Sequence, residues 1–285
     1  MTPADKFAAA GARSRFAKEA LRPDASIDLA RAALLVGAEE EPSHCDVARC
    51  LSHLDSLGEE ARARFERWSE GGSRVELFNR YLFDEQGFIG NAAEYYDPRN
   101  SMLHQVLGRH KGIPITLSIV YIEVGRRAGL RVEGVGLPGH FIVRASEAEG
   151  EGVLVDPFNG RLTDRDECQK RLDLIYDGKL TLTDEYLRPV GARSILVRLL
   201  GNLKAVYVQA QLFRRALAAV ERILLLAPHD LEERRDRGML LAQLNRTSEA
   251  IAETQSYLNL APDAPDAELV REQLKKMRLR QAMLN

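Results

Sequence analysis

The sequence predicts an α+β protein in three parts: N-terminal helices over residues 1–90, a mixed core over residues 91–192, and helical repeats over residues 193–285. Three observations support this prediction. Apolar residues recur at helical spacing in the first part, change from a helical run to short β-like runs in the middle, and repeat with a longer period in the last part. A chain of 285 residues can bury such a core without disulfides or metals.

The composition excludes several classes of protein. The chain has 40 Lys and Arg residues and 42 Asp and Glu residues, a formal net charge of −2, so no net basic field attracts nucleic acid or anionic lipid. The longest uncharged apolar stretch, residues 113–122, is too short to span a bilayer. The N-terminus lacks the apolar core of a signal peptide, and three cysteines build no disulfide framework. We therefore expect a soluble cytoplasmic protein that contacts neither nucleic acid nor membrane.

The first part has a helical pattern from about residue 27 to residue 88. Small and aliphatic residues fall at steps of three and four, which places them on one face of each helix. Three helices are expected, marked in turn by Ala30, Ala33 and Leu34, by Val47, Leu51, Leu54 and Leu57, and by the segment 74–83.

The middle part combines one buried helix with short strands. After a short helix over residues 100–109, Pro114 suits the first turn of the next helix, where its missing N–H is not needed. That helix continues to about Gly129 and is apolar on nearly all sides, so it should be buried. Three β-like runs follow at residues 132–137, 140–144 and 153–156, and the acidic segment 147–151 forms the turn between the last two.

The last part carries an internal repeat. Ala216 and Ala250 lie 34 residues apart, and so do Pro228 and Pro262. This is the period of tetratricopeptide repeats, in which each unit is a helical hairpin. We expect two hairpins and a closing helix over residues 267–284, which covers the otherwise exposed last face.

His140 and Asp156 are expected to face each other. If the runs 140–144 and 153–156 pair through a hairpin centred near Ala148, residues whose numbers sum to 296 are opposed, and these two are such a pair. Opposed residues have Cβ atoms about 5 Å apart, close enough for a carboxylate to orient an imidazole. The alternative is structural, with His140 as a turn residue after Pro-Gly and Asp156 as a strand terminator before proline.

A His–Asp pair calls for a nucleophile, which is expected at the N-terminus of a buried helix. There the helix dipole lowers the pKa of a thiol, and backbone N–H groups can hold an oxyanion. The helix that begins at Pro114 offers the hydroxyls of Thr116 and Ser118 and no cysteine. A hydroxyl reacts only when a base touches it. The alternative for each is a hydrogen bond back to a carbonyl one turn earlier.

The three cysteines are not expected to act as nucleophiles. Cys45 and Cys50 lie five residues apart, about 140° around one helix, so they do not share a face. His44 and His53 make a zinc site conceivable, but one helix cannot place its ligands tetrahedrally. Cys50 is more simply a small core residue, and Cys168 lies in a polar stretch. We expect neither a metal nor a cofactor.

Asn100 and Arg109 are further candidates for a cleft. Asn100 follows Asp97-Pro98 and could cap a helix that starts at Ser101. Arg109 precedes a glycine break and could pair with a buried carboxylate or meet a ligand anion.

Four motifs stand out in the core: Asn100–Leu107, Gly112–Ser118, Gly134–Phe141 with its Pro-Gly-His-Phe, and Asp156-Pro157-Phe158. Taken together, these motifs resemble a known family, the bacterial SirB-type proteins, which are transglutaminase-like proteins with a tetratricopeptide tail. The resemblance spans about residues 28–279 and implies a papain-like transglutaminase core, in which a buried helix packs on an antiparallel sheet. It also implies Cys, His and Asp in that chain order, and His140 and Asp156 match the second and third positions.

The first position of that order departs from the pattern of the active members of the superfamily, which have a cysteine. Counted back from Gly129, the cysteine should fall near residues 114–116, and it is absent there. The resemblance implies that family members generally have Ser or Thr at this point.

Two hypotheses for the function follow. The first is a non-catalytic interaction or regulatory protein that binds a protein partner through its repeats at residues 193–285. The alternative is an amide or ester hydrolase or acyltransferase that uses Thr116 or Ser118 with His140 and Asp156. A hydroxyl within about 3.5 Å of the imidazole and open to solvent favours the enzyme, whereas one bonded to its own helix backbone favours the interaction protein. A metal or small ligand held by His140 and Asp156 is a third, weaker hypothesis.

Overall fold

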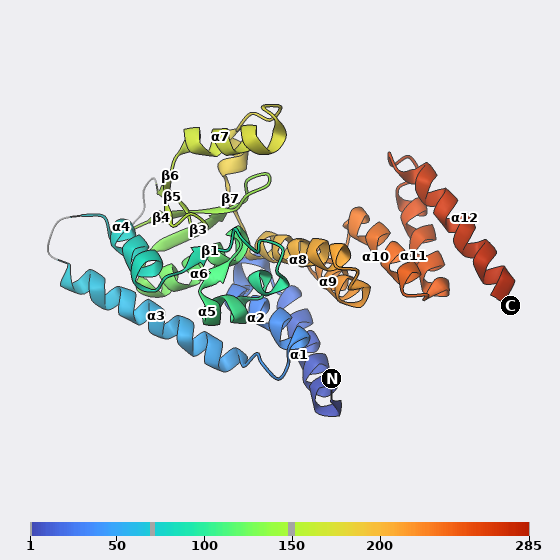
Figure 1. Cartoon of the computed structure of the whole chain (residues 1–285), viewed down its shortest axis with the longest axis horizontal. Coiled ribbons are helices and arrows are strands. Elements are labelled where there is room, and N and C mark those ends of the chain that lie inside the picture. Colours follow the sequence, from blue (N-terminus) through green and yellow to red (C-terminus); the bar gives the residue numbers. More distant parts are fainter. Residues whose placement is uncertain (1, 69–71, 148–151, 285) are drawn as a thin grey trace. The chain divides into compact units, whose positions relative to one another are not determined.

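The computed structural model describes residues 2–68, 72–147 and 152–284. Contacts between Cα atoms divide the chain into two compact units, Met1–Leu199 and Leu200–Asn285. The first unit contains a five-stranded antiparallel sheet with helices around it, and the described part of the second is helical (Figure 1). The α+β fold class predicted from the sequence is confirmed.

Helices form the N-terminal part of the first unit, and side chains cap the first three. Thr2 and Asp5 bond to each other's backbone N–H at the start of α1, while Asp28 and Asp46 cap α2 and α3. Helix α1 lies outside the pattern recognised in the sequence because most of its buried stripe is alanine. The helices are α1 (Pro3–Ala20), α2 (Leu29–Glu40), α3 (Val47–Arg67), α4 (Arg74–Asn79), which continues as a π-helical turn (Arg80–Glu85), and α5 (Leu103–Arg109).

Helix α6 (Pro114–Ala128) is the buried helix that the sequence predicts. It has Pro114 in its first turn and ends at Gly129, whose φ of 96° is left-handed. All but two of its residues are buried. On its N-terminal side the short strands β1 (Ile89–Gly90) and β2 (Lys111–Gly112) pair in parallel.

The sheet has the strand order β6-β5-β4-β3-β7. The central hairpin confirms the predicted strands, with a different register: Val143 opposes Val155 and Arg144 opposes Leu154. The pairing is therefore displaced by two residues from the one predicted, and His140 lies before the strand rather than in it. The strands are β3 (Arg131–Val135), β4 (Ile142–Ser146), β5 (Val153–Asp156), β6 (Arg161–Thr163) and β7 (Pro189–Val190).

The sheet separates two helices. Alternation along the strands places Val132 and Ala145 on the face that packs against α6, since a Cβ on Gly125 of α6 would lie 2.8 Å from Val132. Val135 and Ile142 point to the other face, toward α7 (Arg165–Tyr176). Figure 1 shows α6 and α7 on opposite sides of the sheet. Helix α7 was not predicted, because only Cys168 and Leu172 of its twelve residues are buried.

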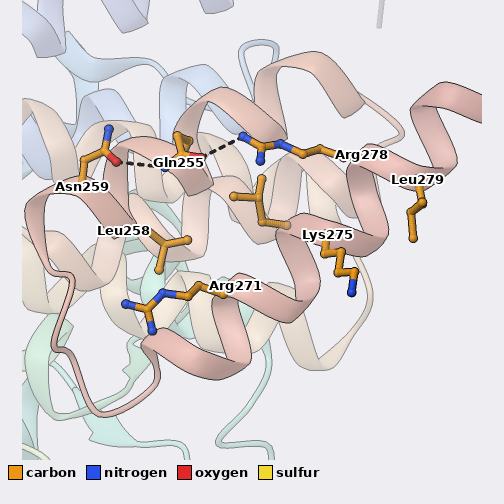
Figure 2. Close-up of a pocket in the computed structure, with 8 residues that line it drawn as sticks. Gln255, Leu258, Asn259, Arg271, Lys275, Arg278 and Leu279 are labelled. Carbon is orange, nitrogen blue, oxygen red and sulfur yellow. Dashed lines mark hydrogen bonds between the residues drawn. The ribbon is translucent and has the colours of Figure 1, made fainter.

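The second unit confirms the predicted hairpins and closing helix. Helices α9, α10, α11 and α12 pack in chain order, and Figure 2 shows α11 beside α12. Gly238 permits the close approach of α10 to α11, because a Cβ there would lie 2.7 Å from Oγ1 of Thr254. None of the described helices is long and apolar enough to cross a membrane. The helices are α8 (Ala192–Gln209), which begins in the first unit, α9 (Phe213–Leu226), α10 (Leu231–Gln243), α11 (Thr247–Leu260) and α12 (Ala267–Leu284).

Candidate functional site

His140 and Asp156 are in direct contact at one end of the β4–β5 hairpin. Nε2 of His140 lies 2.9 Å from Oδ2 of Asp156. A turn at Gly139, with φ of 69°, brings the ring into place, and the backbone N–H of His140 donates to the carbonyl of Leu137. The two residues are 3% and 4% exposed. The pair is therefore buried, with the imidazole held by a carboxylate.

The carboxylate of Asp156 accepts several further hydrogen bonds. Its Oδ1 accepts from the backbone N–H groups of Phe158 and Asn159, while Oδ2 accepts from the Asn159 amide at 2.6 Å and from Arg171 at 3.3 Å. Burial raises the pKa of Asp156, but the bonds from His140 and Asn159 and the charge of Arg171 outweigh it and hold the pKa below its usual range. The carboxylate is thus ionised at neutral pH.

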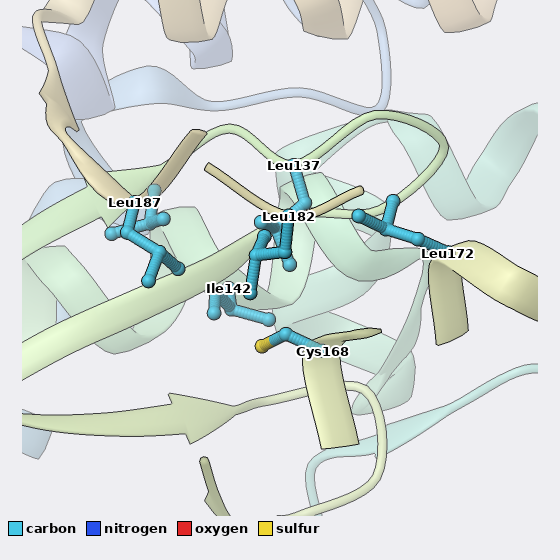
Figure 3. Packing of buried hydrophobic residues seen from close by; sticks show 7 residues of the cluster. Leu137, Ile142, Cys168, Leu172, Leu182 and Leu187 are labelled. Carbon is cyan, nitrogen blue, oxygen red and sulfur yellow. The ribbon is translucent and has the colours of Figure 1, made fainter. Parts of the chain in front are cut away.

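Asn159 and Arg171 are the members of this cluster that sequence reasoning missed. Asn159 follows Asp156 by three residues, so an Asx-type turn after the strand was a usable signal. Arg171 comes from α7, and nothing in the local sequence places that helix over the hairpin. The apolar side of α7 packs on the sheet through Cys168 and Leu172 (Figure 3).

The carboxylate and the buried helix α6 belong to opposite faces of the sheet. Val143 and Val155 oppose each other on the α6 face, so Leu154 and Asp156 point the other way. The contact between Asp156 and Arg171 of α7 agrees with this alternation. Helix α6, which carries the hydroxyls of Thr116 and Ser118, therefore packs on the face of the sheet opposite to Asp156.

Thr116 is fully buried, and its hydroxyl bonds to backbone groups around the start of α6. Its Oγ1 donates to the carbonyl of Asn100 at 2.7 Å and lies 3.1 Å from that of Ile113, while it accepts from the Ile113 N–H at 3.1 Å. No hydrogen bond joins it to His140 within the described chain. Of the two outcomes expected for this hydroxyl, the structure has the backbone-bonded one.

Ser118 is also fully buried, at 0% exposure. Its Oγ finds no hydrogen-bond partner in the part of the chain that the structure describes. The back-bond to a carbonyl that the sequence suggested is thus not formed, and neither is a contact to His140. A hydroxyl without a base in contact and without access to solvent is a poor nucleophile.

Asn100 and Arg109 join one network beside α6. The side chain of Asn100, 0% exposed, donates to the Glu94 carbonyl at 2.6 Å and accepts from Asn91 at 3.1 Å. The prediction that Asn100 caps the following helix is wrong: it lies within a 3-10 turn, Pro98–Ser101, and α5 begins after it with no side-chain cap. Arg109 lies 3.6 Å from the carboxylate of Asp97, the partner type that the sequence suggested.

In the described part of the chain, no hydrogen bond joins a cysteine thiol to the His140 imidazole. Cys45 precedes α3, so the prediction that it shares one helix with Cys50 is wrong. The Cys45 thiol donates to the carbonyl of Leu34 at 3.5 Å, and the closeness of the two thiols raises the pKa of Cys45 and lowers that of Cys50. Burial raises the pKa of Cys168, and the nearby Asp156 carboxylate adds to the effect. The residues that the structure describes include no group of three or more His, Cys, Asp or Glu side chains placed to hold a metal.

Comparison with known proteins gives two matches to families. The profile of the transglutaminase-like superfamily matches residues 48–201. The profile of the tetratricopeptide repeat matches residues 203–275.

Individual relatives match over most of the chain. A UPF0162 protein of Xylella fastidiosa is 38% identical over 255 residues, which is 88% of this chain and 90% of the relative. A UPF0162 protein of Vibrio cholerae is 29% identical over 83% of this chain and 85% of its own length. Protein SirB1 of Salmonella typhimurium is 26% identical over 82% of this chain and 86% of its own length. No solved structure gives a significant match.

Proposed function

This chain belongs to the transglutaminase-like superfamily, and from that premise we propose that it is a non-catalytic interaction or regulatory protein whose helical repeats bind a protein partner. One observation supports the first half of the proposal above all others. The hydroxyl of Thr116, at the point where the family pattern calls for a cysteine, is bonded to the carbonyl of Asn100 and to the backbone of Ile113. Its role there is to stabilise the start of a helix.

The His140–Asp156 pair then serves the fold. Five side-chain and backbone donors surround the Asp156 carboxylate, and they tie the β5 end, the turn at residues 137–140 and helix α7 to one another. Removal of one partner from a buried, fully bonded charge destabilises a fold whether or not a substrate is bound. We therefore assign His140 and Asp156 a structural role inherited from an enzyme fold.

The second half of the proposal rests on the repeats. Tetratricopeptide arrays stack helical hairpins into extended surfaces on which partners dock, and a profile of that repeat covers residues 203–275. Exposed apolar side chains in this part of the chain, Leu212 just before α9, Leu260 at the end of α11 and Leu279 on α12, offer contact area to a partner. We place this role in the cytoplasm, because all three cysteines are free thiols.

Site-specific photo-crosslinking in the full-length chain tests the proposal. A benzophenone amino acid replaces Leu212, Leu260 or Leu279 in the repeats, and Tyr96 or Leu174, which are more exposed large hydrophobic residues, in the first unit. Irradiation of cells that produce each variant should give one recurrent adduct of defined mass from the repeat positions. Adducts confined to Tyr96 and Leu174 would move the binding surface to the first unit and contradict the proposal.

A reactivity test addresses the hydrolase alternative. The intact protein is treated with a fluorophosphonate and with activated amide and ester substrates, then digested and analysed by mass spectrometry. We expect no labelling of Thr116 or Ser118 and no turnover that depends on His140. Covalent labelling of either hydroxyl, abolished by His140→Gln, would establish the enzyme and refute the proposal.

A further inference from the structure

The second unit has a groove between α11 and α12, and none of its lining residues belongs to the His140–Asp156 cluster. Its volume is about 570 Å³, within the range of sites that hold small ligands or a few peptide residues. The groove combines cationic, amide and apolar side chains (Figure 2). Gln255, Leu258 and Asn259 of α11 and Arg271, Leu274, Lys275, Arg278 and Leu279 of α12 line it.

The positive charge of the groove is only partly neutralised. Arg271 pairs with Glu268 at 3.1 Å. Within the described chain, by contrast, Lys275 and Arg278 have no carboxylate within salt-bridge distance, and the polar partner of Arg278 is the neutral amide of Gln255 at 2.8 Å. Helix α12 as a whole carries five Lys and Arg residues against two Glu residues. A carboxylate that enters the groove therefore meets two uncompensated cations.

The amides on the opposite wall are oriented by the same contacts. Gln255 accepts from Arg278 through Oε1, which turns its Nε2 toward Oδ1 of Asn259 at 2.9 Å (Figure 2). Because Oδ1 of Asn259 is thereby engaged as an acceptor, its amide NH₂ is the end left for a further acceptor. This wall thus offers donors, which again suits an anionic group.

Apolar side chains complete the recognition surface. Leu258 and Leu274 are buried at the base of the groove and belong to the core of this unit. Leu279, 54% exposed, extends the apolar surface beside Arg278. An occupant that covers Leu279 while pairing with Lys275 and Arg278 needs an apolar and an acidic side chain close together.

We propose that this groove binds an acidic, partly apolar segment of a partner protein. The inference rests on the proposed function, since it names the chemistry of the partner that the repeats bind and the place where it docks. Charge complementarity identifies the occupant: two cations without carboxylates, an amide that presents donors, and an exposed leucine. A nucleic acid would match the cations but would leave Leu279 without an apolar partner.

Binding of defined probes to the full-length protein tests the inference. The probe is a fluorescein-labelled eight-residue peptide of alternating Glu and Leu, followed by fluorescence anisotropy, with the Gln-Leu peptide and an eight-nucleotide oligouridylate as comparisons. The test variant is Lys275→Glu/Arg278→Glu. The matched control is Lys276→Glu, a charge reversal at an exposed position of the same helix that does not line the groove.

We expect the Glu-Leu peptide to bind the native protein and the Lys276→Glu control, and to lose about tenfold or more in affinity for the double variant. The Gln-Leu peptide should bind at least tenfold more weakly than the Glu-Leu peptide. Absence of peptide binding, equal binding by the double variant, or stronger binding of oligouridylate overturns the inference. Circular dichroism of both variants verifies that the helices remain folded.

Crosslinking at Leu212 and Leu260 in the double variant separates the two proposals. If the repeat adduct persists in the double variant, although this variant no longer binds the peptide, the partner docks elsewhere on the repeats. In that case only the groove assignment fails. If the native chain gives no repeat adduct at all, the proposed function itself fails.

Discussion

Nε2 of His140 lies 2.9 Å from Oδ2 of Asp156, although the two residues are not opposed across the hairpin. The ladder pairs Val143 with Val155, and His140 reaches the carboxylate from the turn that precedes β4. The contact thus depends on a loop conformation, with Gly139 left-handed, as much as on strand pairing. Loss of either partner should loosen both the turn and the end of β5.

Replacement of Asp156 by Asn should destabilise the first unit in a pH-dependent way. The pKa of Asp156 is lowered in the folded protein, so its carboxylate stabilises the fold above the pKa of the unfolded chain, near 4. That contribution disappears as the pH falls through the lower folded value. At pH 7 we expect Asp156→Asn to lose about 1–3 kcal/mol of unfolding free energy, and the difference from native should shrink below about pH 4.

Urea unfolding followed by the fluorescence of Trp68 measures this effect. Trp68 is the single tryptophan and lies in the first unit, so the signal reports on that unit. Asp84→Asn, at an exposed position, is the control and should leave the midpoint unchanged. If Asp156→Asn lost as much unfolding free energy at pH 3 as at pH 7, the ionised carboxylate would not be the cause of the loss.

His140→Ala should also destabilise the first unit, by about 2 kcal/mol or more. The substitution removes a buried ring and leaves the Asp156 carboxylate with one donor fewer. His140→Gln keeps an N–H donor and should recover part of the loss. In a double-mutant cycle with Asp156→Asn, the two losses should be less than additive, because each removes the same contact. Strict additivity would mean that the contact contributes nothing.

Much of the fold follows from the sequence, because the strongest patterns belong to the most buried elements. Helix α6 is apolar on nearly all sides, and the repeat period fixes the hairpins of the second unit. The predicted register of the β4–β5 hairpin was wrong by two residues, yet His140 and Asp156 are in contact. A shift of two keeps every side chain on its face, whereas a shift of one would have separated them. The resemblance to SirB-type proteins is confirmed by the relatives.

The elements that the sequence did not predict have weak local signals. Helix α1 buries mainly alanine, and α7 buries only Cys168 and Leu172, so neither shows a clear apolar stripe. The role of Asn100 depends on its hydrogen bonds to the loop at residues 91–95, and the spacing of residues around Asn100 does not indicate these bonds. Arg171 reaches Asp156 only through the packing of α7 on the sheet. Such contacts follow from tertiary structure rather than from spacing.

Thr116 and Ser118 should respond to substitution in opposite ways. Thr116→Val removes a hydroxyl that bonds to Asn100 and Ile113, and we expect a loss of about 1–3 kcal/mol. Ser118→Ala removes a buried hydroxyl that has no partner in the described structure, and it should be neutral or stabilising by up to about 1 kcal/mol.

Thr116→Ser serves as the control for the first substitution, because it keeps the hydroxyl and loses only a methyl group. Trp68 fluorescence in urea again gives the free energies. If Thr116→Val proved as stable as native, the hydroxyl would be free of a structural role, and the argument against catalysis would weaken.

Alkylation of the thiols should follow their burial and their hydrogen bonds. The neighbouring Cys45 thiol lowers the pKa of Cys50, which is only half-buried, while burial raises the pKa of Cys168. Because the thiolate is the reactive form, iodoacetamide at pH 7.5 should modify Cys50 first and leave Cys168 unmodified in the folded protein. Peptide mass spectrometry over a time course measures the order.

Cys45→Ala isolates the cause of this selectivity. The substitution removes the neighbouring thiol, so the pKa of Cys50 should rise toward the ordinary thiol value and its alkylation at pH 7.5 should slow several-fold. A pH profile of the rate should shift to higher pH by the same cause, which a change in accessibility alone would not produce. Faster modification of Cys168 than of Cys50 in the native protein would mean that α7 opens in solution, and the burial of the His140–Asp156 pair beneath it would then need revision.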